Sequence, residues 1–546
     1  MKRILTSLLF AALCLSLNAQ DDALRLIAEN PDRAANNMHS YEFNPIVDTK
    51  APKGFKPFYI SHYGRHGSRY EQNATFSRAA MRGFAYLDSL NLLTETGKAL
   101  YADVKAVTEA HVGMEGSLTP RGAKEHQTLA KRMSDRFPDV FKNKDRWEVN
   151  SFSSTNFRCI VSMCNFTNSL KAERPRQEFT YTSAERFMRY INPSLRVPRP
   201  GEQPAQRPSF SAEQLARMRG GNQESNKYEP APGEPGYDFT RFLKPLFKDY
   251  DAALKVLGNP EPFVRAIYST GGLCQVIDFM GIDIYRKYFV PEELVYFWAS
   301  GNDSIYRMWG GSVENGDVVR FAIRPLLMDF IEKADAAMQP GSHRTADLRF
   351  GHDTSILPLF ALLGVDDPQH RVFPYKEAHE RGWYAFFQVP MATNCQMIFY
   401  QNKKGEVLTK VLYNEQEVLL PGIEPVSGPY YRWEDLKAHF LNLCKKAAAP
   451  WERAEAAYVD DSYFIDPYHE KNAVLSGGRA VHQCERPGEG RLRLLPQQPV
   501  RQGVSDGELR ALRPREGQSP RGPVRETGHR RRQVRPRQGC RRLLDG

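Results

Sequence analysis

The chain lacks several features that mark common classes of enzyme and transporter. After residue 20, none of its apolar runs is long enough to span a membrane. It contains no G-x-x-x-x-G-K-[ST] phosphate loop, no G-x-S-x-G nucleophile motif and no cluster of residues spaced to ligate a metal ion. These absences argue against a P-loop nucleotidase, a serine hydrolase and a metal-dependent reaction. We therefore expect no metal ion and no cofactor.

The cysteines are too few and too unevenly placed for a disulfide framework. Of the 8 cysteines, Cys14 lies in the first apolar run, and Cys484 and Cys540 lie near the end of the chain. The other five are an odd number: Cys159, Cys164, Cys274, Cys395 and Cys444. We expect mostly buried, unpaired thiols, with at most one or two bridges.

Lysine and most large apolar residues are missing from the end of the chain. Residues 476–546 contain no Lys, Ile, Phe, Tyr, Trp, Met or Asn, and they hold 17 Arg against 7 Asp and Glu. This tail carries +10 of the formal net charge of +11, so residues 1–475 are close to neutral. We interpret the tail as out-of-frame translation of GC-rich DNA; the alternative is a genuine basic tail. In either case it has too few apolar residues to fold, and we expect no nucleic-acid partner.

The first 20 residues have the pattern of an export signal. Met1-Lys2-Arg3 is followed by the apolar run from Ile4 to Leu17 and then by Asn18-Ala19-Gln20. A short basic start, an apolar run of this length and a small residue before the cleavage point are typical of a signal peptide. We predict a signal peptide over residues 1–19 and a periplasmic or secreted protein in a bacterial cell, free of the membrane after cleavage.

A histidine between two arginines is the most informative motif. Residues 65–69 read R-H-G-S-R and follow the strand-like run 58–63. Imidazole can act as a covalent nucleophile, as His66 would here. The forked guanidinium groups of Arg65 and Arg69 match phosphate oxygens, and Gly67 permits a sharp turn. The alternative is an arginine-rich surface loop with an incidental histidine, which only the context of the motif can exclude.

A second motif lies about 290 positions downstream. Residues 348–359 read as a short strand that breaks at Gly351 and enters a helix, which Gly364 is placed to end. His352 and Asp353 therefore lie at the end of a strand, where α/β folds place their chemistry. Taken alone, Asp353 has a simpler interpretation as the N-cap of the helix. Because the first motif is present in the same chain, a functional role for His352 and Asp353 is favoured.

Together the two motifs resemble those of the histidine acid phosphatases, which include phytases and inositol polyphosphate phosphatases. That family carries R-H-G-x-R near its N-terminus and H-D or H-A-E near its C-terminus, and the resemblance covers residues 40–440. Residues 153–158, S-S-T-N-F-R, are similar to the segment that supplies a third phosphate-binding arginine, here Arg158. The first motif is closer to the inositol polyphosphate phosphatases and the second, H-D-T, to the phytases, so the subfamily stays open.

The resemblance implies a two-step phosphoryl transfer. His66 attacks phosphorus, while Arg65, Arg69, Arg158 and His352 hold the other phosphate oxygens. Asp353 protonates the leaving oxygen, and water then hydrolyses the phosphohistidine. An acid optimum is expected, because Asp353 must begin protonated while the cationic cluster lowers the pKa of His66.

Two other histidines receive structural interpretations. His62 precedes the first motif by three residues, and we interpret it as a structural residue near a strand end. His126 lies on the helix expected after Pro120, and we expect its side chain to face solvent.

The distance between the motifs predicts an interrupted domain. The fold class we predict is α/β, with a three-layer α/β/α core and an inserted, mainly helical cap domain. The core would comprise residues 45–180 and 340–450, and the cap residues 181–339. The cap begins in a Pro- and Gly-rich stretch between 197 and 236. Its expected helices are Phe239 to Leu257, Pro262 to Met280, Pro291 to Trp298 and Gly316 to Ala337.

The function that the resemblance implies is hydrolysis of phosphate monoesters. The expected partners are small-molecule phosphate esters, with phytate or other inositol polyphosphates first. The alternatives are a glucose 1-phosphate-type or broad acid phosphatase and, outside enzymes, a phosphate- or polyanion-binding protein of the same fold. The oligomeric state is not predicted.

Overall fold

The computed structural model describes residues 22–193 and 237–447. The predicted signal peptide, the whole Pro- and Gly-rich stretch and the arginine-rich tail lie outside these residues. The fold is mixed α/β, as predicted, with a central sheet of eight strands. The strands are β1 (Lys56–Arg65), β2 (Glu148–Ser153), β3 (Glu178–Thr182), β4 (Arg344–Gly351), β5 (Asn394–Gln401), β6 (Val407–Tyr413), β7 (Gln416–Val418) and β8 (Tyr431–Arg432).

The sheet brings segments that are distant in sequence to one edge. Its order is β3-β2-β4-β1-β5-β6-β7, with β8 paired to β6. Strands β1 to β4 run parallel to one another, whereas β5 pairs antiparallel with β1. In the register of the sheet, Arg65 lies opposite Gly351, and Ser153 lies opposite Phe350. The carboxyl ends of β1, β2 and β4 therefore meet at the same edge, where α/β proteins place their ligands.

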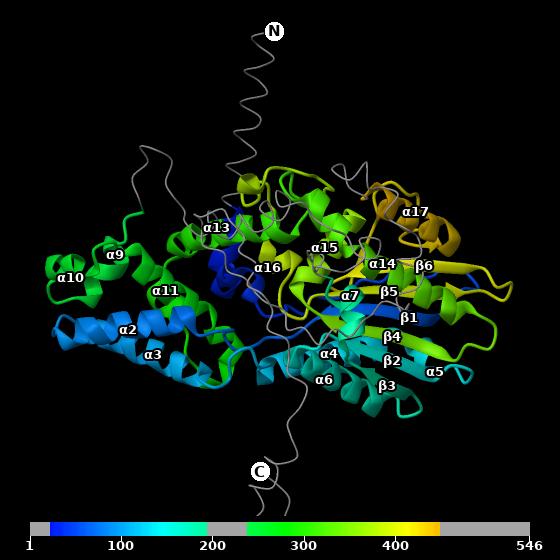
Figure 1. The fold of residues 1–546 in the computed structure, drawn as a ribbon, viewed down its shortest axis with the longest axis horizontal. Coiled ribbons are helices and arrows are strands. Elements are labelled where there is room, and N and C mark those ends of the chain that lie inside the picture. The colour runs from blue at the N-terminus through cyan, green and yellow to red at the C-terminus, as the bar shows by residue number, and fades with distance from the viewer. Residues whose placement is uncertain (1–21, 194–236, 448–546) are drawn as a thin grey trace, which may run out of the picture. The chain divides into compact units, whose positions relative to one another are not determined.

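Helices cover both faces of the sheet (Figure 1). Because side chains alternate along a strand, β1 sends Tyr59 and Tyr63 to one face and Ile60 to the other. The first face packs against α14 (Gly316–Met338), α15 (Asp353–Leu363) and α17 (Trp433–Lys446). The second packs against α4 (Pro120–Arg136), α5 (Pro138–Lys142) and α6 (Phe157–Glu173). This arrangement is the predicted α/β/α layering.

A helical lobe extends from the sheet, at the left of Figure 1. A shared apolar core joins its helices, with Phe84, Leu100, Ile267 and Phe297 among its buried members. The helices are α2 (Thr75–Ser89), α3 (Glu95–His111), α9 (Thr240–Leu243), η4 (Lys244–Leu246), α10 (Tyr250–Leu257), α11 (Glu261–Gly272), η5 (Cys274–Met280), α12 (Ile284–Tyr288) and α13 (Pro291–Trp309). The described chain also contains a helical segment over residues 22–29 and several short helices: η1 (Pro31–Met38), η2 (Glu185–Phe187), α7 (Met188–Ile191), η6 (Tyr375–Glu377) and α16 (Ala385–Gln388).

The packing divides the chain differently from the expected boundaries of 45–180, 181–339 and 340–450. Helices α2 and α3 come from the segment expected to be core, yet they pack in the helical lobe against α11. Helix α14 comes from the expected insert, yet it packs on the sheet. Sequence periodicity shows that a helix has an apolar face but not which partner covers it, which explains both differences.

Two expected helices are interrupted in the structure. The helix expected over residues 239–257 is broken into α9, η4 and α10, with Asp249 capping the start of α10. The helix expected over residues 262–280 changes to 3-10 geometry after Gly272, which lies at the end of α11. By contrast, α13 extends beyond the expected end at Trp298 to Trp309.

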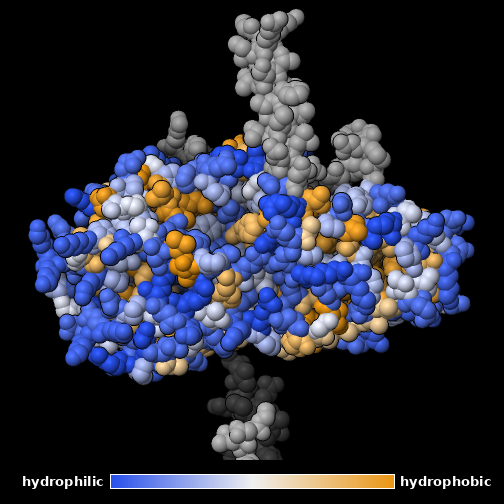
Figure 2. All heavy atoms as spheres, turned by 180° about the vertical axis from the view of Figure 1, so that it is seen from behind, coloured by the Kyte–Doolittle hydropathy of each residue, from blue (hydrophilic) through white to orange (hydrophobic). Residues whose placement is uncertain are grey.

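The cysteines, the helices and one face of the surface can be compared with the expectations from the sequence. Among the described residues, all five cysteines are free and four of them are buried, as predicted. None of the described helices combines the length and the apolar character that a membrane span needs. On the face drawn in Figure 2, hydrophilic residues dominate and apolar residues form small, separate groups.

The prediction for His126 is wrong. Its side chain is 1% exposed and lies between α4 and the sheet, with its ring 5.7 Å from that of Phe350. The apolar stripe of α4 faces the sheet through Leu129 and Met133, and His126 lies on the same buried side. His62 is buried in the same layer, near Phe350.

Candidate active site

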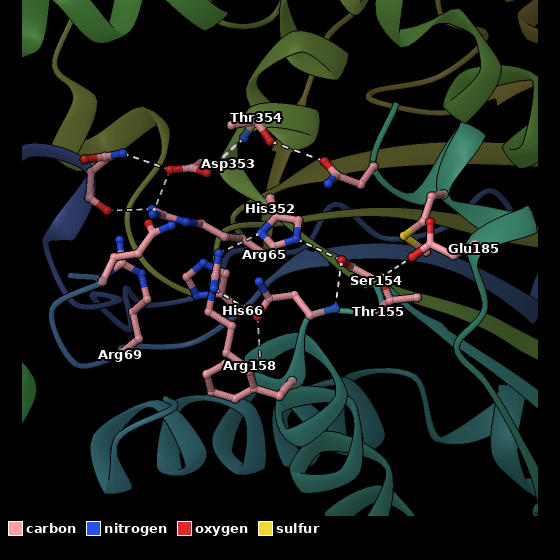
Figure 3. Close-up of a pocket in the computed structure, with 16 residues that line it drawn as sticks. Arg65, His66, Arg69, Ser154, Thr155, Arg158, Glu185, His352, Asp353 and Thr354 are labelled. Atoms are coloured by element: carbon pink, nitrogen blue, oxygen red, sulfur yellow. Dashed lines mark hydrogen bonds and ion pairs between the residues drawn. The ribbon is translucent and has the colours of Figure 1, made fainter. Parts of the chain in front are cut away.

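The predicted site residues line one pocket at the carboxyl edge of the sheet. The pocket has a volume of about 870 Å³, and its wall includes all six of them. They are Arg65, His66, Arg69, Arg158, His352 and Asp353. Figure 3 shows these side chains converging from the ends of β1 and β4 and from the start of α6. Residues almost 290 positions apart meet because β1 and β4 are adjacent parallel strands.

His66 is fixed by both its backbone and its ring. Its backbone N–H donates to the carbonyl of Gly351 at 2.9 Å, and Nδ1 lies 2.9 Å from the carbonyl oxygen of Gly67. A carbonyl oxygen only accepts hydrogen bonds, so Nδ1 carries the proton and Nε2 keeps its lone pair. Burial, followed by the charges of Arg65 and Arg158, holds the pKa of His66 well below its ordinary value. The imidazole therefore stays neutral into the acid range.

The glycine of the first motif permits a close approach of two segments. A Cβ atom on Gly67 would lie 2.5 Å from the carbonyl oxygen of Gly122, at the start of α4. Next in the chain, Ser68 donates from its backbone N–H and from Oγ to the two carboxylate oxygens of Glu125, each at 2.7 Å. The loop that carries His66 is thereby held against α4, which explains why this turn needs glycine followed by a small polar residue.

Arg65 connects the two motifs. Its Nη1 donates to the carbonyl oxygens of Asn37 at 2.5 Å and Val389 at 2.7 Å, and its Nη2 donates to Asp353 Oδ2 at 2.9 Å. The side chain is 1% exposed, so its position is determined by these three partners. Arg65 therefore places Asp353 as well as contributing positive charge beside His66.

The three arginines carry more positive charge than their surroundings balance. Burial, then Arg65 and Arg158, lower the pKa of Arg69 to about 10. Burial and the charge of Arg158 also lower the pKa of Arg65, against the opposing effect of Asp353. The Nε atoms of Arg65, Arg69 and Arg158 are buried and have no hydrogen-bond partner among the described residues. Such exceptions among buried polar groups call for an explanation, and an oxyanion bound by these guanidinium groups supplies one.

His352 is engaged with the protein through both ring nitrogens. Nε2 lies 2.9 Å from Ser154 Oγ, and Nδ1 lies 3.4 Å from Nη2 of Arg158. Because a guanidinium group can only donate, Nδ1 accepts and Nε2 carries the proton. Burial and the charge of Arg158 lower the pKa of His352 to about 4. In this arrangement His352 orients Arg158. A direct hydrogen bond from His352 to a phosphate oxygen would require His352 to give up its bond to Ser154 or to Arg158.

Asp353 accepts hydrogen bonds on both carboxylate oxygens. Oδ2 accepts from Arg65 at 2.9 Å and from Asn37 Nδ2 at 2.8 Å, and Oδ1 accepts from the backbone N–H of Thr354 at 3.0 Å. Asp353 is the first residue of α15 rather than its cap, so the simpler interpretation as an N-cap is wrong. Gly364, with φ of 71°, ends this helix as predicted.

The protonation state expected for Asp353 needs correction. Burial alone would raise its pKa, but the charges of Arg65 and Arg69 hold that pKa below the ordinary value for aspartate. In the ligand-free site the carboxyl group is therefore ionised near pH 5 and does not begin protonated.

Several pocket residues were not identified from the sequence. Asn37, from η1, bonds to both Arg65 and Asp353. Gln72, Glu185 and Asn192 also line the pocket. None of these residues belongs to a motif, because each reaches the pocket through the tertiary fold. Among the described residues, no group of three or more His, Cys, Asp or Glu side chains is arranged to hold a metal ion.

The fold is similar to that of solved phosphatases. Two structures of the multiple inositol polyphosphate phosphatase of Bifidobacterium longum, in complex with inositol hexasulfate and with phosphate, align with TM-scores of 0.58 and 0.59 at 17% and 18% identity. Each alignment covers 75% of this chain and 97% of the other. The phytase from D. castellii aligns with a TM-score of 0.57 at 14% identity, over 81% of this chain and 91% of that one. Comparisons with protein-family models and with curated proteins find no match.

Proposed function

We propose that the protein is a histidine acid phosphatase that hydrolyses phosphate monoesters through a phosphohistidine on His66. The observation that carries this proposal is the excess positive charge around a neutral imidazole. Arg65, Arg69 and Arg158 surround His66, and Asp353 is the only one of the six predicted site residues that is acidic. A phosphate group needs this combination of bidentate cations and a nucleophile with a free lone pair.

The roles follow from the hydrogen bonds. His66 Nε2 attacks phosphorus while Nδ1 stays bonded to the carbonyl of Gly67, which keeps the ring oriented. The arginines bind the phosphate oxygens that do not react, and they stabilise charge that spreads over them in the transition state. Asp353 donates a proton to the leaving oxygen and then accepts one from the water that hydrolyses the phosphohistidine.

The proton for the first step arrives with the substrate. The second pKa of a phosphate monoester is about 6, so near pH 5 the ester carries one proton. Binding brings this proton next to Asp353, whose pKa rises as the arginine charge is offset. An acid optimum is still expected, because the ester brings the proton only at acid pH. Asp353 does not need to start protonated.

The proposed substrates are inositol polyphosphates. Two observations support this proposal: the fold is similar to that of an inositol polyphosphate phosphatase and a phytase, and a volume of about 870 Å³ is ample for a substituted six-membered ring. The alternatives are a glucose 1-phosphate-type or broad acid phosphatase. The N-terminal sequence pattern supports export to the periplasm or medium, which cell fractionation would test.

The test is phosphate release by the purified full chain near pH 5 from inositol hexakisphosphate, glucose 1-phosphate and an aryl phosphate. We expect turnover that His66→Ala abolishes. Turnover of the small esters alone would remove the inositol assignment and keep the chemistry. No turnover of any ester, with phosphate still bound, would replace the enzyme by a phosphate-binding protein.

A further inference from the structure

The charge on the pocket wall is distributed unevenly. The three arginines gather around His66, where the reacting phosphate would bind. Away from these arginines, the described wall has two carboxylates, Asp353 and Glu185. Its other polar side chains, apart from the two histidines, are neutral: Asn37, Gln72, Ser154, Thr155, Asn156, Asn192 and Thr354. In the view of Figure 3, Glu185 and Arg69 lie on opposite sides of His66 and His352. Away from the three arginines, the described wall therefore offers hydrogen-bonding groups and these two carboxylates, but no lysine or further arginine.

Glu185 is connected to the groups that hold the phosphate site. Its Oε1 accepts from Thr155 Oγ1 at 3.0 Å. The neighbours of Thr155 on either side are Ser154, 2.9 Å from His352, and Asn156, whose Oδ1 accepts from Arg158 Nη1 at 2.9 Å. The carboxylate thus lies one residue away from two groups that orient the phosphate-binding side chains.

The backbone of Glu185 is held in place by an apolar contact between its helix and the sheet. It begins the short helix η2, which ends at the buried side chain of Phe187. The ring of Phe187 packs 5.8 Å from that of Phe152 on β2. The position of Glu185 at the pocket wall is therefore determined by the sheet.

We infer that Glu185 is a specificity-determining residue, one that favours esters with a hydroxyl rather than a second phosphate beside the reacting group. This inference rests on the proposed function. A carboxylate accepts a hydrogen bond from a hydroxyl group, as Glu185 does from Thr155. It repels a phosphate, which carries like charge, and because Glu185 is exposed, water weakens this repulsion without removing it. The expected penalty on a neighbouring phosphate is about threefold in kcat/KM.

The preference has a consequence for inositol polyphosphates. A fully phosphorylated ring must place a phosphate beside the reacting one, whereas a partly dephosphorylated ring can offer a hydroxyl there. The pocket is therefore expected to turn over partly dephosphorylated rings more efficiently than the hexakisphosphate, so that intermediates do not accumulate once hydrolysis has begun.

The test is Glu185→Gln in the full chain, with Glu173→Gln as the matched control. Glu173 is an exposed glutamate at the end of α6, about 20 Å along the helix from the pocket. For wild type and both variants, kcat and KM are measured near pH 6 with inositol hexakisphosphate and with glucose 1-phosphate, which has a single phosphate and an adjacent hydroxyl. We expect Glu185→Gln to raise the ratio of kcat/KM for hexakisphosphate over glucose 1-phosphate by about threefold, mainly through KM, and Glu173→Gln to leave it unchanged.

The outcomes separate this inference from the proposed function. An unchanged or lower ratio in Glu185→Gln overturns the inference, as does an equal loss on both esters, which would indicate a structural role. If the wild type turns over neither ester, the proposed function fails, and the inference fails with it. A rise in the ratio that also occurs in Glu173→Gln would reflect net charge rather than the pocket, and it too would overturn the inference.

Discussion

Replacement of Asp353 by asparagine is expected to affect esters according to their leaving groups. In the structure, Asp353 accepts three hydrogen bonds, including that from Arg65 at 2.9 Å. Asparagine has nearly the same shape but carries no acidic proton. Sugar alkoxides are poor leaving groups, and loss of a general acid typically costs about 10²–10⁴ in rate. A nitrophenolate leaves as a stable anion and needs little help from an acid.

The geometry sets the size of the expected effect. The amide can accept from Arg65 and Asn37 through its single oxygen, but its NH₂ group then faces the N–H of Thr354, so one of the present bonds is lost. That loss costs about 1 kcal/mol, or roughly fivefold, and it applies equally to every ester. We therefore expect Asp353→Asn to lower kcat/KM for glucose 1-phosphate by about 1,000-fold and for nitrophenyl phosphate by about tenfold.

The assay compares the two esters in wild type, in Asp353→Asn and in Asn37→Ala. Asn37→Ala removes one bond to Asp353 and keeps the acid, so we expect a loss of about tenfold or less on both esters and little change in their ratio. Equal losses on the two esters in Asp353→Asn would refute the role of Asp353 as proton donor and would leave it only a structural or electrostatic one.

Three further changes probe charge, acid stability and packing. Arg158→Gln should lower kcat/KM about 100-fold. Because the charge of Arg158 depresses the pKa of His66, the same change should also move the acid limb of the pH profile to higher pH. Arg158→Lys, which keeps the charge, should leave that limb in place. Burial lowers the pKa of His126 from 6.5 to about 3. The unfolded chain therefore binds more protons than the folded one between these values, and stability falls as pH drops below 6.5. His126→Phe should reduce the loss of unfolding free energy between pH 7.5 and pH 5 by about 2 kcal/mol in urea titrations, and an unchanged loss would show that His126 is not buried as described. Gly67→Ala should lower the free energy of unfolding by about 1–3 kcal/mol and reduce kcat, because its Cβ would press on Gly122; wild-type stability and rate would contradict the close approach.

The sequence predicted the motif residues of the pocket better than it predicted the residues that support them. The two motifs pointed to His66 and Asp353, and both side chains line the pocket. The position of these residues at one edge followed from strands that end at Arg65 and Gly351. Asn37 and Glu185 were missed, since nothing in the local sequence marks a side chain that reaches the pocket through the fold.

The errors have a common physical origin. His126 was placed in solvent because histidine is often exposed, yet it lies on the same side of α4 as Leu129, facing the sheet. Asp353 was expected to start protonated because its role requires a proton, while its pKa depends on the charges of Arg65 and Arg69. In both cases the deciding interaction is with residues distant in sequence.

The proposed mechanism depends above all on the transfer of phosphate to His66. We would mix the full chain with inositol hexakisphosphate, or with an aryl phosphate, for milliseconds, and quench the reaction in base, where phosphohistidine survives. Peptide mass spectrometry would then locate the phosphate. We expect phosphate on the peptide that contains His66, at near-stoichiometric level during turnover, absent in His66→Ala and persistent when Asp353→Asn slows the second step. Turnover with no phosphorylated His66 at any time, or with phosphate on another residue, would contradict it.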